Sequence, residues 1–231
     1  MPAWGMHIAL AHILNKKWKL PYDTFLIGNI LPDIGNGYTI AHPSLSLPYS
    51  ISHFAKKMEV GNIEGEVLPD VNAFVLRYQK QLHDPIILGY LTHLLADFYW
   101  NWITYQKFWW ENKNTGQIGV KRQDGSIILC ENETRKNWKR EDFHIFTSYL
   151  LQRMECPDIT YQDSLLQGTS KILEFDVPKT DVMQAVALAN EIIHQAKESI
   201  ITEEYQLYTL QELKQEWDRC ITFITQYIEN S

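Results

Sequence analysis

A histidine and an aspartate stand four residues apart inside the most apolar stretch of the chain. The stretch is Pro85–Ile103, and His93 and Asp97 are its only charged or readily titrating side chains. On a helix, two residues at this spacing lie one turn apart on the same face. Because burying an unpaired carboxylate is costly or forces it to take up a proton, both groups need a partner. A divalent metal ion is one such partner, and a His–Asp hydrogen bond inside the core is the other.

Three further residues of metal-ligand type occupy apolar or helix-terminal positions. His7 lies on the apolar face of an expected first helix, Asp33 lies between apolar residues beside a turn, and His53 lies in a short expected helix. Each has a structural explanation as well: an Asp after proline often caps a helix or turn, and a core-facing histidine needs only a hydrogen-bond partner. Together with His93 and Asp97 they provide three imidazoles and two carboxylates, which suits one or two zinc-class ions.

The chemistry open to such a set is hydrolysis assisted by metal. Two-metal sites hold their ions about 3.5–4 Å apart and are suited to attack on phosphate esters. Asp97, one helical turn from His93, is the natural candidate for a carboxylate that bridges two ions.

The hydrophobic periodicity predicts a mostly helical chain that positions these residues. An apolar segment over 24–35 closes at Pro32-Asp33 and a turn at 35–37, and a short helix begins near residue 49. Other helices are expected at about 4–17, 71–82, 85–103, 138–154, 180–201 and 209–229. Residues 59–70 are expected to form an acidic loop, and 117–130 a hairpin turning at 123–125. The predicted fold class is all-α, with six or seven helices and one small β-hairpin, in a single domain over residues 1–231.

Composition narrows the class of protein. The chain has 231 residues, of which 45% are hydrophobic, and its few Gly and Pro exclude a low-complexity protein. A net charge of −7 with no Lys/Arg cluster argues against general nucleic-acid binding. The polar residues within 85–103 argue against a transmembrane segment. The three cysteines are odd in number and scattered, which is typical of reduced thiols in a cytoplasmic protein. The lysines near the N-terminus follow the first apolar stretch, which is the reverse of a secretory signal, so we expect a cytoplasmic location.

Four short motifs resemble those of one known family. They are Trp4-x-x-His7, GNILPDI at Gly28–Ile34, SHF at Ser52–Phe54, and GYLTHLLADFYWN at Gly89–Asn101. This series is similar to the zinc-dependent phospholipase C family, and the resemblance covers roughly the first half of the chain. It implies an all-helical fold related to a group of single-strand-preferring nucleases, and hydrolysis of phosphodiester bonds by a cluster of zinc ions.

The resemblance also implies a role for each candidate residue. His7 matches the early helix histidine of one zinc ion. Asp33, His53 and His93 match the ligands of a second ion, and Asp97 matches the carboxylate that bridges two metals. A metal-bound water would then be the nucleophile, with Asp33 and Asp97 as the catalytic carboxylates and a phosphoester as the substrate.

The chain departs from the family pattern at two places. Secreted members bind one zinc ion through the amino group of a processed N-terminal tryptophan, whereas Trp4 here follows Met1-Pro2-Ala3. Members with three zinc ions have a histidine about six residues after the bridging Asp, where this chain has Ile103. We therefore expect one or two ions.

Two later positions are the candidates for a third ion. His194 and Glu198 have the spacing of a ligand pair, but they share a polar helix face typical of a solvated surface. His144 has only Ser148 one turn further on, and serine is a poor zinc ligand.

Two other functions compete with a zinc-dependent phosphoester hydrolase. The first is a non-catalytic metal-binding or partner-binding module, which the missing third-site ligands favour; the aromatic run Tyr99–Trp110 could serve an interface, although such clusters are more often core. The second is an HD-type phosphohydrolase, which uses a His-Asp doublet such as His83-Asp84. Because Pro85 disfavours α geometry at the residue before it, we expect Asp84 to cap the next helix instead.

Overall fold

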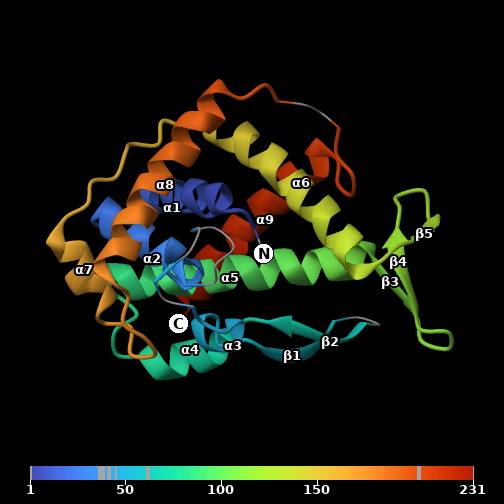
Figure 1. Cartoon of the computed structure of the whole chain (residues 1–231), viewed down its shortest axis with the longest axis horizontal. Coiled ribbons are helices and arrows are strands. Elements are labelled where there is room, and N and C mark those ends of the chain that lie inside the picture. The colour runs from blue at the N-terminus through green and yellow to red at the C-terminus, as the bar shows by residue number, and fades with distance from the viewer. Residues whose placement is uncertain are drawn as a thin grey trace.

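The computed structural model describes residues 2–35, 40, 43–44, 46–60, 63–201 and 204–230. Within them the chain forms nine helices and two small antiparallel sheets, which confirms the mostly helical class (Figure 1). The helices are α1 (Trp4–Trp18), α2 (Tyr22–Ile34), α3 (Tyr49–Ser52), α4 (Val71–Tyr78), α5 (Pro85–Phe108), α6 (Asn132–Leu151), α7 (Asp163–Thr169), α8 (Lys179–Glu198) and α9 (Leu210–Glu229). The short helix α7 was not expected from the sequence.

Helix α5 runs through the middle of the molecule, and α1, α2, α4 and α9 pack against it (Figure 1). It begins at Pro85, and the Asp84 side chain caps it by accepting a hydrogen bond from the backbone N–H of Ile86 at 3.0 Å. The expected cap is therefore confirmed. The helix continues past Ile103 to Phe108, since Tyr105 and Phe108 extend its buried face. No helix in the described part of the chain is both long and apolar enough to cross a membrane.

Among the described residues, α2 and α5 share the most extensive contact between two helices, and two glycines allow it. A Cβ on Gly89 would lie 2.3 Å from the carbonyl oxygen of Phe25, and one on Gly28 would lie 2.4 Å from that of Ile86. The two backbones can therefore approach only where both positions lack a side chain. Helix α2 also differs from expectation, because it includes Pro32 and ends at Ile34; residues 36 and 37 of the expected turn lie outside the described residues.

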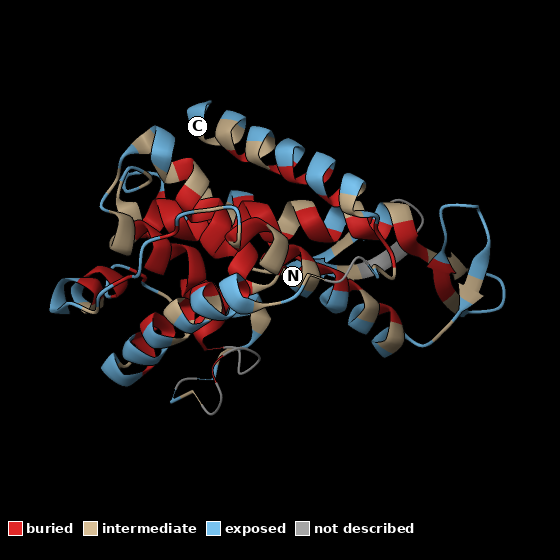
Figure 2. Cartoon of the chain, turned by 90° about the horizontal axis from the view of Figure 1, so that it is seen from above, coloured by how far each residue is buried: buried red, intermediate tan, exposed pale blue. Residues whose placement is uncertain are grey.

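The remaining long helices cover the two central ones. Helix α1 packs on α2, α6 and α8, and α9 packs along α5. Figure 2 shows buried residues throughout the interior, while α9, which ends at the C-terminus, is exposed on its outer side. A capping box between Thr209 and Glu212 begins α9. The aromatic run at the end of α5 is mainly core: Trp100, Phe108 and Trp109 are buried, and Trp102 is 36% exposed.

The β structure exceeds the single hairpin that the sequence predicted. Strands β1 (Lys56–Val60) and β2 (Ile63–Leu68) form an antiparallel pair where an acidic loop was expected, so that prediction was wrong. The prediction gave more weight to the acidic residues than to the alternation of apolar and polar residues along the segment. Val60 and Leu68 are buried and hold the hairpin against the core.

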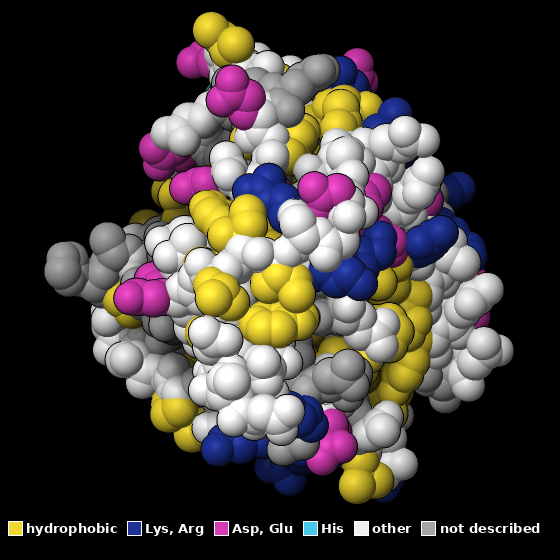
Figure 3. Space-filling model, turned by 90° about the vertical axis from the view of Figure 1, so that its right-hand side faces the viewer, with side chains coloured by type: hydrophobic (Ala, Val, Ile, Leu, Met, Phe, Trp, Pro, Cys, Tyr) yellow, Lys and Arg dark blue, Asp and Glu magenta, His cyan; other side chains and the backbone are white. Residues whose placement is uncertain are grey.

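The second sheet contains the predicted hairpin and one further strand. Its strands are β3 (Trp109–Asn112), β4 (Gln117–Lys121) and β5 (Ile127–Leu129), in that spatial order. The turn falls at the expected place, where Gly125 has a φ of 84°. Seen from the end of the molecule that carries this sheet, hydrophobic side chains lie among charged ones (Figure 3); Ile127 and Leu129 of β5 are exposed.

Candidate metal centre

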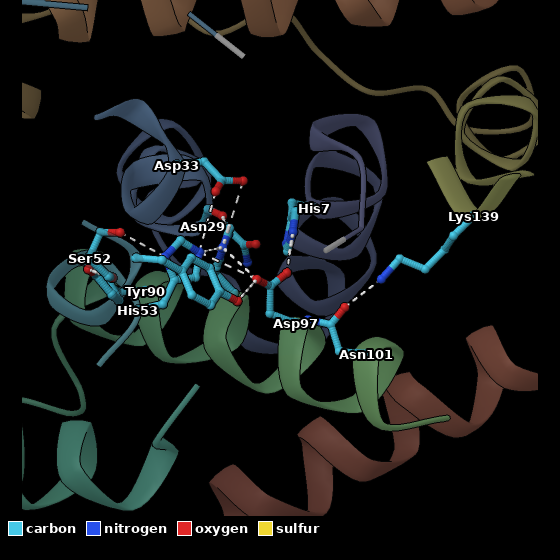
Figure 4. Close-up of polar contacts among 11 residues, drawn as sticks. His7, Asn29, Asp33, Ser52, His53, Tyr90, Asp97, Asn101 and Lys139 are labelled. Carbon is cyan, nitrogen blue, oxygen red and sulfur yellow. Dashed lines mark hydrogen bonds and ion pairs between the residues drawn. The ribbon is translucent and has the colours of Figure 1, made fainter. Parts of the chain in front are cut away.

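Five side chains from four segments meet at one buried point. His7 comes from α1, Asp33 from the last turn of α2, His53 from the residue that ends α3, and Asp97 from α5 (Figure 4). His93 also comes from α5, one turn before Asp97. Each is at most 1% exposed. The structure thus brings together every residue that the sequence selected as a metal ligand.

His93 is held in one tautomer by the backbone of α2. Its Nδ1 lies 2.7 Å from the carbonyl oxygen of Asn29, and a carbonyl only accepts hydrogen bonds, so Nδ1 carries the proton. The lone pair of the neutral ring is therefore on Nε2, which faces the other four residues. Burial, together with the neighbouring His7, lowers the pKa of His93 to about 3, so the ring is neutral at physiological pH.

His53 points its Nε2 at the same place. The atom lies 3.1 Å from His93 Nε2, and 3.4 Å from both Asp33 Oδ1 and Asp97 Oδ2. On the other side of the ring, Nδ1 is 2.8 Å from the Ser52 hydroxyl. This contact fixes the orientation of the imidazole, as hydrogen-bond partners of metal-binding histidines do.

His7 completes the set from the side of α1. Its ring stacks on that of His93, with centroids 3.9 Å apart, and its Nε2 lies 3.4 Å from Asp97 Oδ1. Among the described residues neither ring nitrogen of His7 nor Asp97 Oδ1 has a hydrogen bond, although all three atoms are buried. Asp97 Oδ2 accepts a hydrogen bond from the hydroxyl of Tyr49 at 3.1 Å.

Both carboxylates are ionised despite their burial. Burial alone would raise the pKa of Asp97, but His93, His7 and His53 outweigh it and hold the pKa well below its usual range. The same opposition lowers the pKa of Asp33, where burial is outweighed by His93 and His53. Two carboxylates and the lone pair of His93 Nε2 are directed at one buried point, and a cation between them would offset the cost of burying the two negative charges.

The donor set and its spacing fit zinc-class ions. The ligand atoms form two overlapping groups, each lying within 4.8 Å: His7, Asp33 and His93, and His53, His93 and Asp97. Two nitrogens that share one tetrahedral zinc ion at about 2.0–2.1 Å lie roughly 3.3 Å apart, close to the 3.1 Å between His53 and His93. Nitrogen and carboxylate oxygen donors are those that zinc-class ions accept.

Three supporting residues escaped the sequence reasoning. Asn29, Tyr49 and Ser52 contact or flank the ligands, and both polar side-chain atoms of Asn29 are buried without a hydrogen bond among the described residues. Asn29 lies one turn before Asp33 and Ser52 directly before His53, so position relative to an expected ligand was the available signal.

The residues weighed for other sites lie outside this cluster. His144, His194 and Glu198 are exposed, and none belongs to either group of ligand atoms. His194 Nε2 instead lies 2.8 Å from the Asp158 carboxylate at the surface. His83 is also exposed, and its neighbour Asp84 caps α5, as described above, which gives the doublet a structural role.

Comparison with known proteins agrees with the geometry. The family model of zinc dependent phospholipase C matches residues 2–155, which span α1 to α6 and contain all five clustered residues. Neither the comparison with curated proteins nor that with solved structures found a match. A match over this much of the chain establishes membership: the chain belongs to the zinc-dependent phospholipase C family.

Proposed function

We propose that the protein is a metal-dependent phosphoester hydrolase that works with one or two zinc ions. His7, Asp33, His53, His93 and Asp97 would hold the ions, and Asp33 and Asp97 are the proposed catalytic carboxylates. The observation that carries the proposal is the convergence of both ionised carboxylates on the lone pair of His93 Nε2 at a buried point. Family membership supplies the reaction class.

Bound zinc would supply Lewis acidity toward the phosphate oxygens and lower the pKa of a coordinated water toward neutrality. The residues of the chain provide the rest of the mechanism. The α2 backbone keeps the proton of His93 on Nδ1, and Ser52 orients His53. Asp97 faces His7 with one oxygen and His53 with the other, the arrangement expected of a bridging carboxylate.

Tyr49 adds a polar group to the less buried edge of the cluster. Its ring stacks on His53 at 4.0 Å, its hydroxyl donates to Asp97, and the residue itself is only half-buried. Burial and the nearby Asp97 raise the pKa of Tyr49 well above its usual value, so the hydroxyl stays protonated and acts as a donor. We infer that the substrate phosphoester approaches from this edge, and that the protein acts in the cytoplasm.

A second candidate function is a metal-binding module without turnover. It is favoured by the exposed positions of His144 and of the pair His194 and Glu198, which leave a third site without these ligands. The buried cluster would then stabilise the fold, and an incomplete set of ions would not hydrolyse esters.

Metal analysis combined with turnover separates the two functions. The purified protein is reconstituted with zinc, its metal content is measured, and hydrolysis of a chromogenic phosphodiester and phosphomonoester is followed. His93→Ala and Asp97→Ala should lose metal and activity together, whereas His194→Ala, which removes an exposed imidazole, should keep both. A wild-type protein that takes up no metal contradicts the hydrolase, and stoichiometric zinc without turnover of either ester supports the module.

A further inference from the structure

The polar face of α5 continues beyond the candidate metal centre. His93, Asp97, Asn101 and Tyr105 follow one another at intervals of four residues and so lie in one row along the helix. All four are buried, and Asn101 is 3% exposed. The metal centre occupies the first two positions of this row, which leaves two buried polar side chains beyond it.

Two buried cations of α6 face the second half of the row. Lys139 Nζ donates a hydrogen bond to Asn101 Oδ1 at 2.7 Å and lies 5.6 Å from the centre of the Tyr105 ring. Figure 4 shows the Lys139 side chain reaching from α6 toward Asn101 on α5, which lies one turn from Asp97. Arg135, one turn before Lys139 on α6, is 5% exposed, and its Nη1 has no hydrogen bond among the described residues.

Within the part of the chain that the structure describes, no carboxylate forms an ion pair with Lys139, whose ammonium is hydrogen-bonded to Asn101. Asp97 and Glu66 are the carboxylates that act on it. In the proposed function the charge of Asp97 is taken up by metal, and Glu66 lies 3.5 Å from Nη2 of Arg135. The ligand cluster brings two carboxylates, which one divalent ion neutralises and two ions exceed. With metal bound, Lys139 is therefore a buried positive charge beside a centre that is neutral or positive.

A buried cation in this position calls for an anion. We infer that Lys139, with Arg135 behind it, forms an anion subsite that binds the phosphate group of the substrate next to the metal centre. The inference rests on the proposed function for the identity of the substrate, but the binding of phosphate is a property that can be measured without turnover. Lys139 is in this view a substrate-binding residue, oriented by Asn101.

The competing explanation is that Lys139 only fills space in the core. Its ammonium lies between Tyr105 and Phe143, 5.8 Å from the Phe143 ring, where an apolar chain of similar length would also pack. The variant Lys139→Met therefore separates the two explanations, because it keeps the length and apolar packing and removes the charge together with the hydrogen bond to Asn101. Lys136, three residues earlier on α6 and exposed, gives a matched control in Lys136→Met.

The test is titration of inorganic phosphate into the zinc-loaded proteins by calorimetry, with metal content and helical circular dichroism recorded for each. Lys139→Met should keep metal and helix content while its phosphate affinity falls about 10- to 100-fold, as expected for loss of a hydrogen bond to a charged group. Lys136→Met should bind phosphate as the wild type does. Equal phosphate affinity in a folded, zinc-loaded Lys139→Met overturns the inference.

A second variant and a measurement of turnover cover the remaining outcomes. If Lys139→Met does not fold, Lys139→Gln, which can still hydrogen-bond Asn101, is titrated in its place; failure of both neutral variants to fold would show a structural role and overturn the inference. If the wild type binds phosphate through Lys139 but hydrolyses no ester, the proposed hydrolase fails while the anion subsite stands. If it hydrolyses esters and phosphate affinity is independent of Lys139, the subsite alone fails.

Discussion

His93 Nδ1 donates its hydrogen bond to the backbone carbonyl of Asn29, across the contact between α5 and α2. Because the acceptor is a main-chain atom, its place depends on how closely the two helices pack rather than on the side chain at position 29. The packing of α2 on α5 therefore determines which nitrogen of His93 faces the candidate metal centre. Helix geometry and ligand chemistry are coupled at this single bond.

His53 is oriented by a side chain instead, which makes its orientation testable. The change Ser52→Ala removes the hydroxyl that lies 2.8 Å from His53 Nδ1 and keeps the backbone carbonyl that accepts from Tyr90. Loss of such a partner typically weakens metal binding by 10- to 100-fold, and we expect a fall of about tenfold, measured by competition with a chelator. Ser50→Ala, at an exposed position of the same short helix, is the control. Unchanged zinc affinity in Ser52→Ala would show that packing alone orients the ring.

Gly89→Ala tests the close approach of α2 and α5. The added methyl would meet the backbone of Phe25 at 2.3 Å and the backbone nitrogen of Asn29 at 2.8 Å, and neither can move without displacing α2. We expect a loss of about 3 kcal/mol in the free energy of unfolding, measured in urea, together with weaker zinc binding.

Gly168→Ala gives the comparison for Gly89→Ala. Its methyl would meet only side-chain atoms of Ile86, at 2.9 and 3.2 Å, which can shift to a new rotamer. Gly168→Ala should lower the free energy of unfolding by about 1 kcal/mol or less and leave zinc affinity unchanged. Equal losses in the two variants would contradict the view that the backbone contact positions the ligands.

The sequence predicted which side chains come together better than it predicted their surroundings. His93 and Asp97 are conspicuous because they are titrating groups in an apolar helix, and Asp84-Pro85 marks where that helix begins. The position of Asn29 one turn before Asp33 was a signal, but the hydrogen bond of its backbone carbonyl with His93 was not predictable, because it depends on two glycines that allow backbones far apart in sequence to touch. Lys139 was also missed: in the sequence it is one of several lysines and arginines at the start of α6, and only the packing of α6 on α5 buries it.

The prediction of secondary structure failed where charged and polar residues obscured the hydrophobic periodicity. The segment that forms β1 and β2 is rich in Glu, which suggested a loop, yet Val60 and Leu68 provide enough apolar contact to hold a hairpin. The predicted end of α5 was too early for a similar reason. Its last turns mix Gln and Lys with aromatics, and the aromatic residues continue the buried row in space although the sequence looks less apolar.

Acid should destabilise the metal-free protein through the candidate ligands. The pKa of His93 is lowered to about 3 in the folded state from 6.5, so between these values the unfolded chain binds the extra proton. Stability is therefore highest above about pH 6.5 and falls as pH decreases, by up to ~1.4 kcal/mol per pH unit for this group. The lowered pKa values of Asp33 and Asp97 extend the loss below about pH 4.

Urea unfolding of the metal-free protein at a series of pH values measures this effect. His93→Gln, which can still donate to the Asn29 carbonyl, should show a shallower decline between pH 6.5 and 4. The exposed change His194→Gln should follow the wild type. A decline of the same slope in His93→Gln would assign acid sensitivity to other groups.

Because Lys139 is buried, the free energy of unfolding should change with pH in the alkaline range. Burial lowers the pKa of Lys139 to about 8 from 10.5, against the attraction of Asp97 on α5 and Glu66 on β2. The cost of the buried charge is fully present below pH 8 and disappears as pH rises to 10.5, because over this range the unfolded chain holds the proton more tightly. Measured by urea unfolding of the metal-free proteins, wild type should therefore gain about 3 kcal/mol over Lys139→Met between pH 8 and 10.5, and Lys136→Met should show no such change relative to wild type. A constant difference between wild type and Lys139→Met would mean that the ammonium is hydrated, and would remove the electrostatic reason for an anion beside it.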